Sequence, residues 1–197
     1  MTERPRRAWL HDGSSISQCG EADLPTHTWP GRVARMHGVD LTSWGFGGQC
    51  HLDPLVARVM DAQRTDAISI KVGINIYGQA SLGPRTFRSN AIAFVRLLRE
   101  AHPTVPLAVI SPIFSPVREA TLNRAGLTLQ MMRTDLASAV EALRTHGDQQ
   151  VHYLDGLDLF GSADRECLPD FLHPDTEGYR RIAERFSARL GGILFGD

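Results

Sequence analysis

Four segments of this 197-residue chain carry residues whose types and order could perform acyl transfer. Residues 11–18 supply three serine hydroxyls, residues 43–49 supply glycines, and residues 73–78 supply an asparagine. Near the other end of the chain, Asp170 and His173 lie three residues apart and are followed by a proline. A hydroxyl, donors for a negatively charged oxygen and an Asp/His pair are the groups that acyl transfer requires.

Each of these residue types has a defined chemical task in such a reaction. A serine hydroxyl is a poor nucleophile unless a neighbouring base takes its proton, and a histidine can do so near neutral pH. The imidazole ring has to be held in one tautomer by an acceptor on its second nitrogen, commonly a carboxylate. The tetrahedral intermediate then needs hydrogen-bond donors for its new negative oxygen, which a glycine N–H and an asparagine amide can supply.

Five short apolar runs predict β-strands, and each run stops at a residue type that favours turns. The runs lie at residues 8–10, 39–42, 67–72, 106–110 and 151–154. Three of the four chemically interesting segments follow directly after a predicted strand.

Apolar residues with helical spacing occupy the stretches between these strands. The predicted helices cover residues 55–60, 86–101, 127–145 and 175–190, and Gly191-Gly192 is expected to end the last one. Strands that alternate with helices predict an α/β fold with a doubly wound parallel sheet. Ligands bind beyond the carboxyl ends of the strands in such sheets, so the polar segments are expected to meet there.

The order of the four segments is also characteristic of a family. They read Gly13-Ser14-Ser15, then Gly48 after a Ser-x-Gly-x-Gly lead, then Gly73-Ile74-Asn75, then Asp170-Phe171-Leu172-His173. The chain therefore resembles the SGNH hydrolase superfamily, which includes the GDSL-type lipases and esterases. Ser14 and Ile76 stand where that family commonly has aspartates.

This resemblance implies a flavodoxin-like three-layer α/β/α sandwich with a central five-stranded parallel sheet. The length suits one domain over residues 1–197. The resemblance assigns Ser15 as nucleophile, His173 as base and Asp170 as the residue that orients it. It assigns Ser15, Gly48 and Asn75 to the oxyanion hole.

Several of these residues also have plain structural interpretations. Ser14 and Ser17 are the other possible nucleophiles, although they suit helix capping better. Gly45 and Gly47 could serve only the shape of the backbone, or one of them could supply the amide instead of Gly48.

Five aromatic residues near the predicted strand ends could line an acyl or alcohol pocket, and the alternative for each is core packing. They are Trp44, Phe46, Tyr77, Phe114 and Phe171. No spacing of His, Cys, Asp or Glu favours a metal site, and no cofactor is expected.

The composition bears on partners and compartment. The formal net charge is -1, from 21 basic and 22 acidic residues, which favours neither nucleic acid nor an anionic membrane as a partner. No stretch approaches 18 apolar residues, and the N-terminus lacks the apolar segment of a signal peptide.

Three widely spaced cysteines suit reduced thiols in a cytoplasmic protein. Nothing in the sequence indicates the oligomeric state.

The sequence therefore predicts a cofactor-free esterase that removes a short acyl group from a sugar or small metabolite through an acyl-enzyme. A long-chain lipase is less favoured because there is no apolar insertion large enough for a lid. One alternative is an acyltransferase that uses the same residues. Another is an inactive carbohydrate-binding module on the same fold, although the presence of Ser15, Asn75, Asp170 and His173 argues against it. Flavin or nucleotide binding ranks last, because no Gly-x-Gly-x-x-Gly lies between a strand and a helix.

Overall fold

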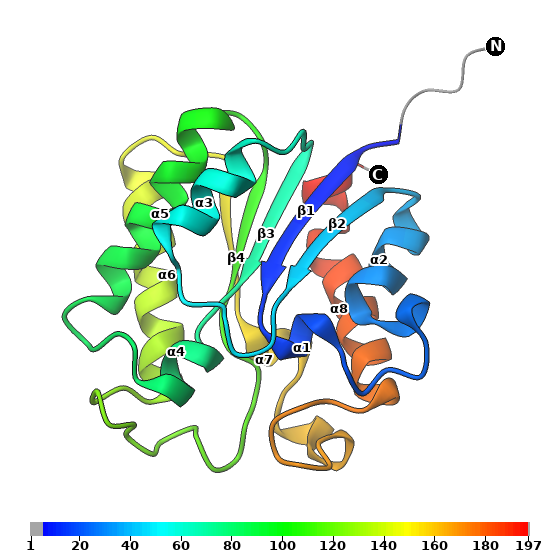
Figure 1. Ribbon diagram of the computed structural model, residues 1–197, viewed down its shortest axis with the longest axis vertical. Coiled ribbons are helices and arrows are strands. Elements are labelled where there is room, and N and C mark those ends of the chain that lie inside the picture. The colour runs from blue at the N-terminus through cyan, green and yellow to red at the C-terminus, as the bar shows by residue number, and fades with distance from the viewer. Residues whose placement is uncertain (1–5, 197) are drawn as a thin grey trace.

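A five-stranded, entirely parallel sheet forms the centre of the computed structural model, which describes residues 6–196 (Figure 1). The strand order is β2-β1-β3-β4-β5. The strands are β1 (Ala8–Gly13), β2 (Asp40–Gly45), β3 (Ala67–Lys71), β4 (Leu107–Ile110) and β5 (Val151–Leu154). The chain moves outward from β1 to β2 and then crosses back to β3, so the order reverses between β1 and β3. This is the flavodoxin-like order that the family resemblance implies, and that expectation is confirmed.

Helices cover both faces of the sheet and complete the three layers (Figure 1). On one face lie α2 (Trp29–His37) and α8 (Thr176–Phe195), and on the other lie α3 (Pro54–Asp61), α5 (Phe87–Ala101) and α6 (Leu129–Thr145). Three short helices follow strands at the carboxyl edge, namely α1 (Ser15–Gln18), α4 (Ile74–Gln79) and α7 (Gly156–Leu159). Two 3-10 helices cover Pro25–His27 and Ser162–Cys167.

An aromatic cluster fixes α2 and α8 against strand β1. The ring of Trp9 is fully buried and lies 6.2 Å from Trp29 and 5.4 Å from both Phe186 and Phe195, centroid to centroid. Every residue of β3 is buried as well, because helices cover both of its faces. The positions of the first and last elements of the chain are therefore set by the same core.

The predicted end of the last helix is wrong. Helix α8 continues through Gly191-Gly192 to Phe195, and Gly196 ends it with φ +66°. Gly191 serves packing instead, because a Cβ at this position would lie 2.5 Å from the His37 ring on α2. The sequence prediction also omitted α2, whose start contains Pro30 and Gly31 and is capped by the Thr28 hydroxyl.

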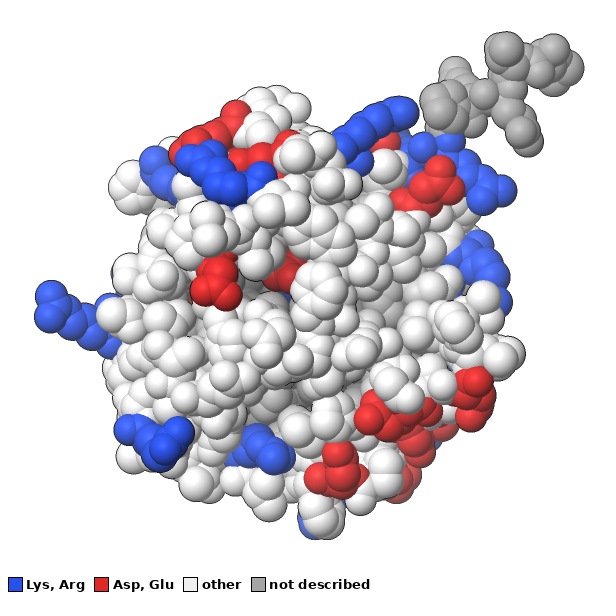
Figure 2. Space-filling view, viewed as in Figure 1, with Lys and Arg blue, Asp and Glu red and all other residues white. Residues whose placement is uncertain are grey.

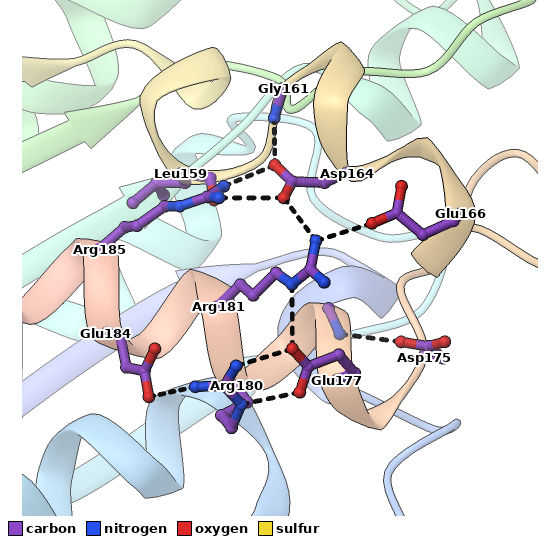
Figure 3. A network of polar contacts seen from close by, with 11 residues as sticks. Leu159, Gly161, Asp164, Glu166, Asp175, Glu177, Arg180, Arg181, Glu184 and Arg185 are labelled. Atoms are coloured by element: carbon purple, nitrogen blue, oxygen red, sulfur yellow. Dashed lines mark hydrogen bonds and ion pairs between the residues drawn. The ribbon is translucent and has the colours of Figure 1, made fainter.

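A charge network joins the 3-10 helix at 162–167 to the first half of α8 (Figure 3). The Asp164 side chain is only 3% exposed and forms ion pairs with Arg181 and Arg185. Burial alone would raise the pKa of Asp164, but hydrogen bonds from Arg185, the Gly161 N–H and Arg181 outweigh it and lower the pKa to about 2. Because this segment leads directly into Asp170, the network fixes the stretch of chain that precedes it.

We predict that Asp164→Asn lowers the free energy of unfolding at pH 7 by about 1–3 kcal/mol, as for loss of a charged hydrogen-bond partner. The pKa of Asp164 is lower in the folded chain than its ordinary value, so its contribution is complete above about pH 4 and disappears as the pH falls towards 2. Urea unfolding at pH 7 and pH 3 should show the difference between the two proteins narrowing at pH 3. The control is Glu166→Gln, since Glu166 is 62% exposed and pairs only with Arg181. Equal stability of Asp164→Asn and wild type at pH 7 would contradict the prediction.

Candidate active site

Ser15, His173 and Asp170 form a continuous hydrogen-bonded row. Ser15 Oγ lies 2.9 Å from His173 Nε2, and His173 Nδ1 lies 2.6 Å from Asp170 Oδ2. A carboxylate can only accept hydrogen bonds, so the proton of the neutral imidazole sits on Nδ1 and the lone pair of Nε2 faces the serine hydroxyl. This arrangement can take a proton from Ser15.

The turn after β1 presents Ser15 and conceals the neighbouring serines. Ser14 is buried, and its hydroxyl accepts a hydrogen bond from the Ile16 N–H at 3.3 Å as the cap of α1. Ser17 is buried and bonds to His11. Ser15 is partly exposed, and its own N–H has no acceptor among residues 6–196. Of the three serines, Ser15 is the one whose hydroxyl meets His173.

His11 is a buried residue of this region that sequence reasoning did not place. Its Nδ1 lies 2.7 Å from Ser69 Oγ and its Nε2 lies 2.8 Å from Ser17 Oγ, so it connects β1, β3 and α1. Burial, aided by the charge of Lys71, lowers the pKa of His11 to about 3, and the ring is therefore neutral. The available signal was that His11 lies two residues after Trp9, on the same buried face of the strand.

The loop after β2 lies between α1 and α4. Gly47 donates its N–H to Gln18 Oε1 at 3.0 Å, and a Cβ on Gly47 would lie 3.8 Å from the Ser15 Cβ. Cys50 donates its N–H to Asn75 Oδ1 at 3.1 Å. These contacts bring the glycine segment and the asparagine to the serine, as the sequence predicts for the carboxyl edge of the sheet.

Two more N–H donors in this region are free. Gly48 has φ +75°, and its N–H finds no acceptor within the described residues. Asn75 Oδ1 accepts the hydrogen bond from the Cys50 N–H. The amide nitrogen of Asn75 has no partner within residues 6–196. Together with the Ser15 N–H, these groups can donate to a negatively charged oxygen. Asn75 lies in the first turn of α4, whereas the sequence indicated only a segment after a strand.

The loop that carries His173 is shaped by Asp170. Asp170 Oδ1 accepts hydrogen bonds from the N–H groups of Leu172 and His173 at 2.9 and 2.6 Å. Partial burial would raise the pKa of Asp170, but the hydrogen bonds from His173 and Leu172 outweigh it and hold the pKa below its ordinary value. Asp170 is therefore a carboxylate at neutral pH.

The loop after β4 supports this turn from its other side. The carbonyl of Phe171, whose φ is +62°, accepts hydrogen bonds from Ser115 Oγ at 2.8 Å and from Arg118 at 3.3 Å. The Ser115 N–H bonds to Glu119, which pairs with the buried Arg133. A positive φ is unfavourable for phenylalanine, so these contacts help to hold the turn between Asp170 and His173.

The aromatic residues named from the sequence fall into two groups. Phe46 and Phe171 are 52% and 47% exposed. Phe46 directly precedes Gly47, and Phe171 lies two residues before His173, with the Arg165 guanidinium 5.9 Å from the centre of its ring. Tyr77 is buried and donates its hydroxyl to the Thr121 carbonyl at 3.0 Å. The partly buried Trp44 and Phe114 pack against the core. Phe46 and Phe171 are thus the aromatic residues of this set most available to a substrate.

Within residues 6–196, no three His, Cys, Asp or Glu side chains gather closely enough to hold a metal ion. No helix in that range is both long and apolar enough to cross a membrane. Part of the N-terminal segment used for the signal-peptide prediction, residues 1–5, lies outside the described residues.

Comparison with known proteins gives the family. Residues 13–181 match the model of the GDSL-like lipase/acylhydrolase family, and the chain belongs to this family. This confirms the resemblance drawn from the four sequence blocks. No protein with a curated function matches the chain in sequence.

Solved structures with the same fold include enzymes of two kinds. The salicylyl-acyltransferase SsfX3 from a tetracycline biosynthetic pathway is 32% identical with a TM-score of 0.87, over 98% of this chain and 56% of that one. A putative GDSL-like lipase from Bacteroides ovatus is 23% identical with a TM-score of 0.83, over 96% of this chain and 54% of that one. A family two carbohydrate esterase from Clostridium thermocellum, in complex with cellohexaose, is 16% identical with a TM-score of 0.72, over 98% and 66% of the two chains. This chain therefore spans little more than half the length of the first two.

We predict that Ser115→Ala loosens the turn between Asp170 and His173, because the Phe171 carbonyl then keeps only its longer bond to Arg118. Loss of one such hydrogen bond corresponds to about 1 kcal/mol, or about fivefold faster amide exchange over residues 168–175. Hydrogen–deuterium exchange read by mass spectrometry measures this. Ser89→Ala, which removes an exposed hydroxyl on α5, is the control. Unchanged protection of residues 168–175 in Ser115→Ala would show that the turn does not need this bond.

Proposed function

We propose that this chain is a serine esterase that removes a short acyl group, such as acetyl, from a sugar or small metabolite. The observation that carries the proposal is the row of hydrogen bonds from Ser15 through His173 to Asp170. The family and the free N–H groups beside Ser15 support it.

In the first half of the reaction, Ser15 Oγ forms a bond to the ester carbonyl carbon while its proton passes to His173 Nε2. The electron pair of the carbonyl π bond moves onto the oxygen, which becomes negatively charged. Donors at Ser15, Gly48 and Asn75 stabilise that charge. Asp170 remains a carboxylate and holds the Nδ1–H of the imidazolium.

In the second half, the bond between the carbonyl carbon and the alcohol oxygen breaks, and His173 Nε2 gives its proton to the leaving alcohol. A water molecule then attacks the acyl-enzyme while His173 takes one of its protons. The bond to Ser15 Oγ breaks, the proton returns to that oxygen, and the free acid departs.

Exposed aromatic residues and a nearly balanced charge support a small, neutral substrate. Phe46 and Phe171 are exposed in the two loops that follow β2 and precede α8. On the face shown in Figure 2, charged side chains of both signs lie around the rim and few lie over the middle, and the formal net charge of the chain is -1. The three cysteines are free and buried, which supports the cytoplasm as the compartment of the reaction.

We expect the purified protein to hydrolyse p-nitrophenyl esters, with acetate and other short chains turned over faster than octanoate. Ser15→Ala should lower kcat by at least about 10³-fold, since removing the nucleophile abolishes the acyl-enzyme. Ser14→Ala is the matched control: it removes a neighbouring hydroxyl that caps α1, and should lose stability but retain turnover. Equal activity in the wild type and in Ser15→Ala would show that Ser15 is not the nucleophile. A silent wild type that binds oligosaccharides would favour the inactive module.

Acyl transfer to an alcohol is the second candidate. The observation that favours it is that the salicylyl-acyltransferase is the most similar in sequence of the structures described above, at 32% identity. Both reactions share the acyl-enzyme and differ only in whether water or an alcohol attacks it.

Product analysis separates the two reactions. With p-nitrophenyl acetate as donor and a sugar or glycerol as acceptor, we expect free acetate to remain the main product. Chromatography of the acyl products, with acceptor present and absent, measures the partition. Replacement of most of the acetate by acetylated acceptor would assign the chain as a transferase.

A further inference from the structure

The peptide groups on both sides of the Gly48 N–H are held by side chains. The carbonyl of Gly48 accepts hydrogen bonds from Gln79 Nε2 at 2.5 Å and from His51 Nε2 at 2.9 Å. On the preceding side, the Gly47 N–H donates to Gln18 Oε1 at 3.0 Å. The N–H of Gly48 lies between these two anchored points.

Helix α4 links this anchoring to the asparagine. Asn75 and Gln79 are four residues apart, so they lie on the same side of α4. Asn75 holds the Cys50 N–H through its Oδ1, and Gln79 holds the Gly48 carbonyl. One face of α4 therefore fixes the loop that contains Gly48 and also carries the free amide of Asn75.

The second donor to the Gly48 carbonyl is itself oriented. A carbonyl only accepts hydrogen bonds, so His51 must carry a proton on Nε2. His51 Nδ1 lies 2.8 Å from Ser81 Oγ, just beyond the end of α4, and with the ring proton on Nε2 it accepts a hydrogen bond from the Ser81 hydroxyl. Ser81 thereby fixes the ring plane of His51.

The loop also has backbone hydrogen bonds of its own: Phe46 donates its N–H to the Gly13 carbonyl at 3.0 Å, and Gln49 donates its N–H to the Phe46 carbonyl at 3.1 Å. The side chains add anchors at the peptide groups next to the Gly48 N–H. Glycine rotates about its backbone more freely than any other residue, and Phe46, Gly47 and Gln49 are exposed. A donor to an oxyanion is effective when its direction is fixed before the charge develops. The hydrogen bonds to the Gly48 carbonyl limit rotation of that residue and so fix the direction of its N–H.

We propose that Gln79 and His51 are positioning residues that hold the Gly48 N–H ready for the oxyanion. This proposal rests on the proposed function, because it assigns the Gly48 N–H to that reaction. Neither side chain has to touch the substrate, and the two share the same carbonyl.

The test uses Gln79→Met and His51→Phe, which remove the two donors with little change in size, singly and together. Each single variant keeps one donor, so we expect kcat on p-nitrophenyl acetate to fall about two- to fivefold. The double variant should fall by about 50-fold, more than the product of the singles, approaching the 10²–10³-fold loss typical of a missing oxyanion donor. KM should stay within about twofold and Tm within about 2 °C if the effect is confined to the direction of one N–H. Combining Gln79→Met with His51→Gln, which retains a donor, should rescue kcat.

A second readout separates positioning from general damage. A small alkylboronic acid adds to Ser15 Oγ through its boron, and the tetrahedral, negatively charged adduct resembles the intermediate. Its inhibition constant should rise in proportion to the loss of kcat, while KM for the ester stays unchanged. Loss of kcat together with a raised KM and a lowered Tm would overturn the proposal, since it would show that the loop had collapsed.

If the double variant had the same kcat and the same boronate affinity as the wild type, the proposal would be overturned and the esterase assignment would stay intact. Absence of Ser15-dependent turnover in the wild type would overturn both.

Discussion

The 2.9 Å contact between Ser15 Oγ and His173 Nε2 joins residues that lie 158 positions apart. It can form only if the first strand and the last helix are held in a fixed position relative to each other, and packing holds them there. Trp9 on β1 lies 5.4 Å from Phe186 on α8, and Tyr179 in the first turns of α8 donates its hydroxyl to Glu21, just after α1, at 2.8 Å. The apolar cluster sets the distance between β1 and α8, and the tyrosine ties their active-site ends together. The geometry of the row from Ser15 through His173 to Asp170 therefore depends on an apolar core that lies outside it.

Around this contact, side chains hold some backbone polar groups of the loops, and other backbone N–H groups have no acceptor within residues 6–196. Carbonyls and N–H groups of the three loops are paired by side chains from other elements, such as Ser115 on Phe171 and Gln79 on Gly48. The N–H groups of Ser15 and Gly48 have no acceptor within residues 6–196. Folded chains rarely leave such groups without a partner unless water or a ligand reaches them. Ser15 and Gly48 are both partly exposed, so water or a substrate oxygen can reach these two N–H groups.

The parallel α/β fold and the edge of the sheet where the candidate residues lie could be predicted from local pattern and one rule of topology, whereas the roles of those residues came from the family resemblance. Apolar runs ending at Gly13 and Gly73 mark strands, and the carboxyl ends of parallel strands meet at one edge. Contacts between elements could not be predicted in this way. His11 looks like a polar residue at a strand end, yet it is buried because Ser17 and Ser69 arrive from α1 and β3.

The helix errors have the same origin. Gly191-Gly192 is typical of the end of a helix, but α8 continues past it. Because Gly191 lacks a side chain, the His37 ring of α2 can pack against this position. Gln79 gave no signal at all, because its partner is a backbone carbonyl 31 residues away and α4 itself was not expected. The pattern of apolar residues along the chain indicates which face of a helix or strand is buried. The roles of Gly191 and Gln79 depend instead on contacts with a neighbouring element.

The exposure of the site bears on the fate of an acyl-enzyme. Ser15 and His173 are only partly buried, and the Asp170 side chain is 51% exposed, so water has direct access to the base in this chain. Attack by water needs no dedicated acceptor site, whereas transfer to an alcohol requires a bound acceptor that competes with water or excludes it. This chain covers 56% of the acyltransferase chain. The exposure of Ser15 and His173 supports the proposed hydrolysis, because water can reach the acyl-enzyme without a bound acceptor.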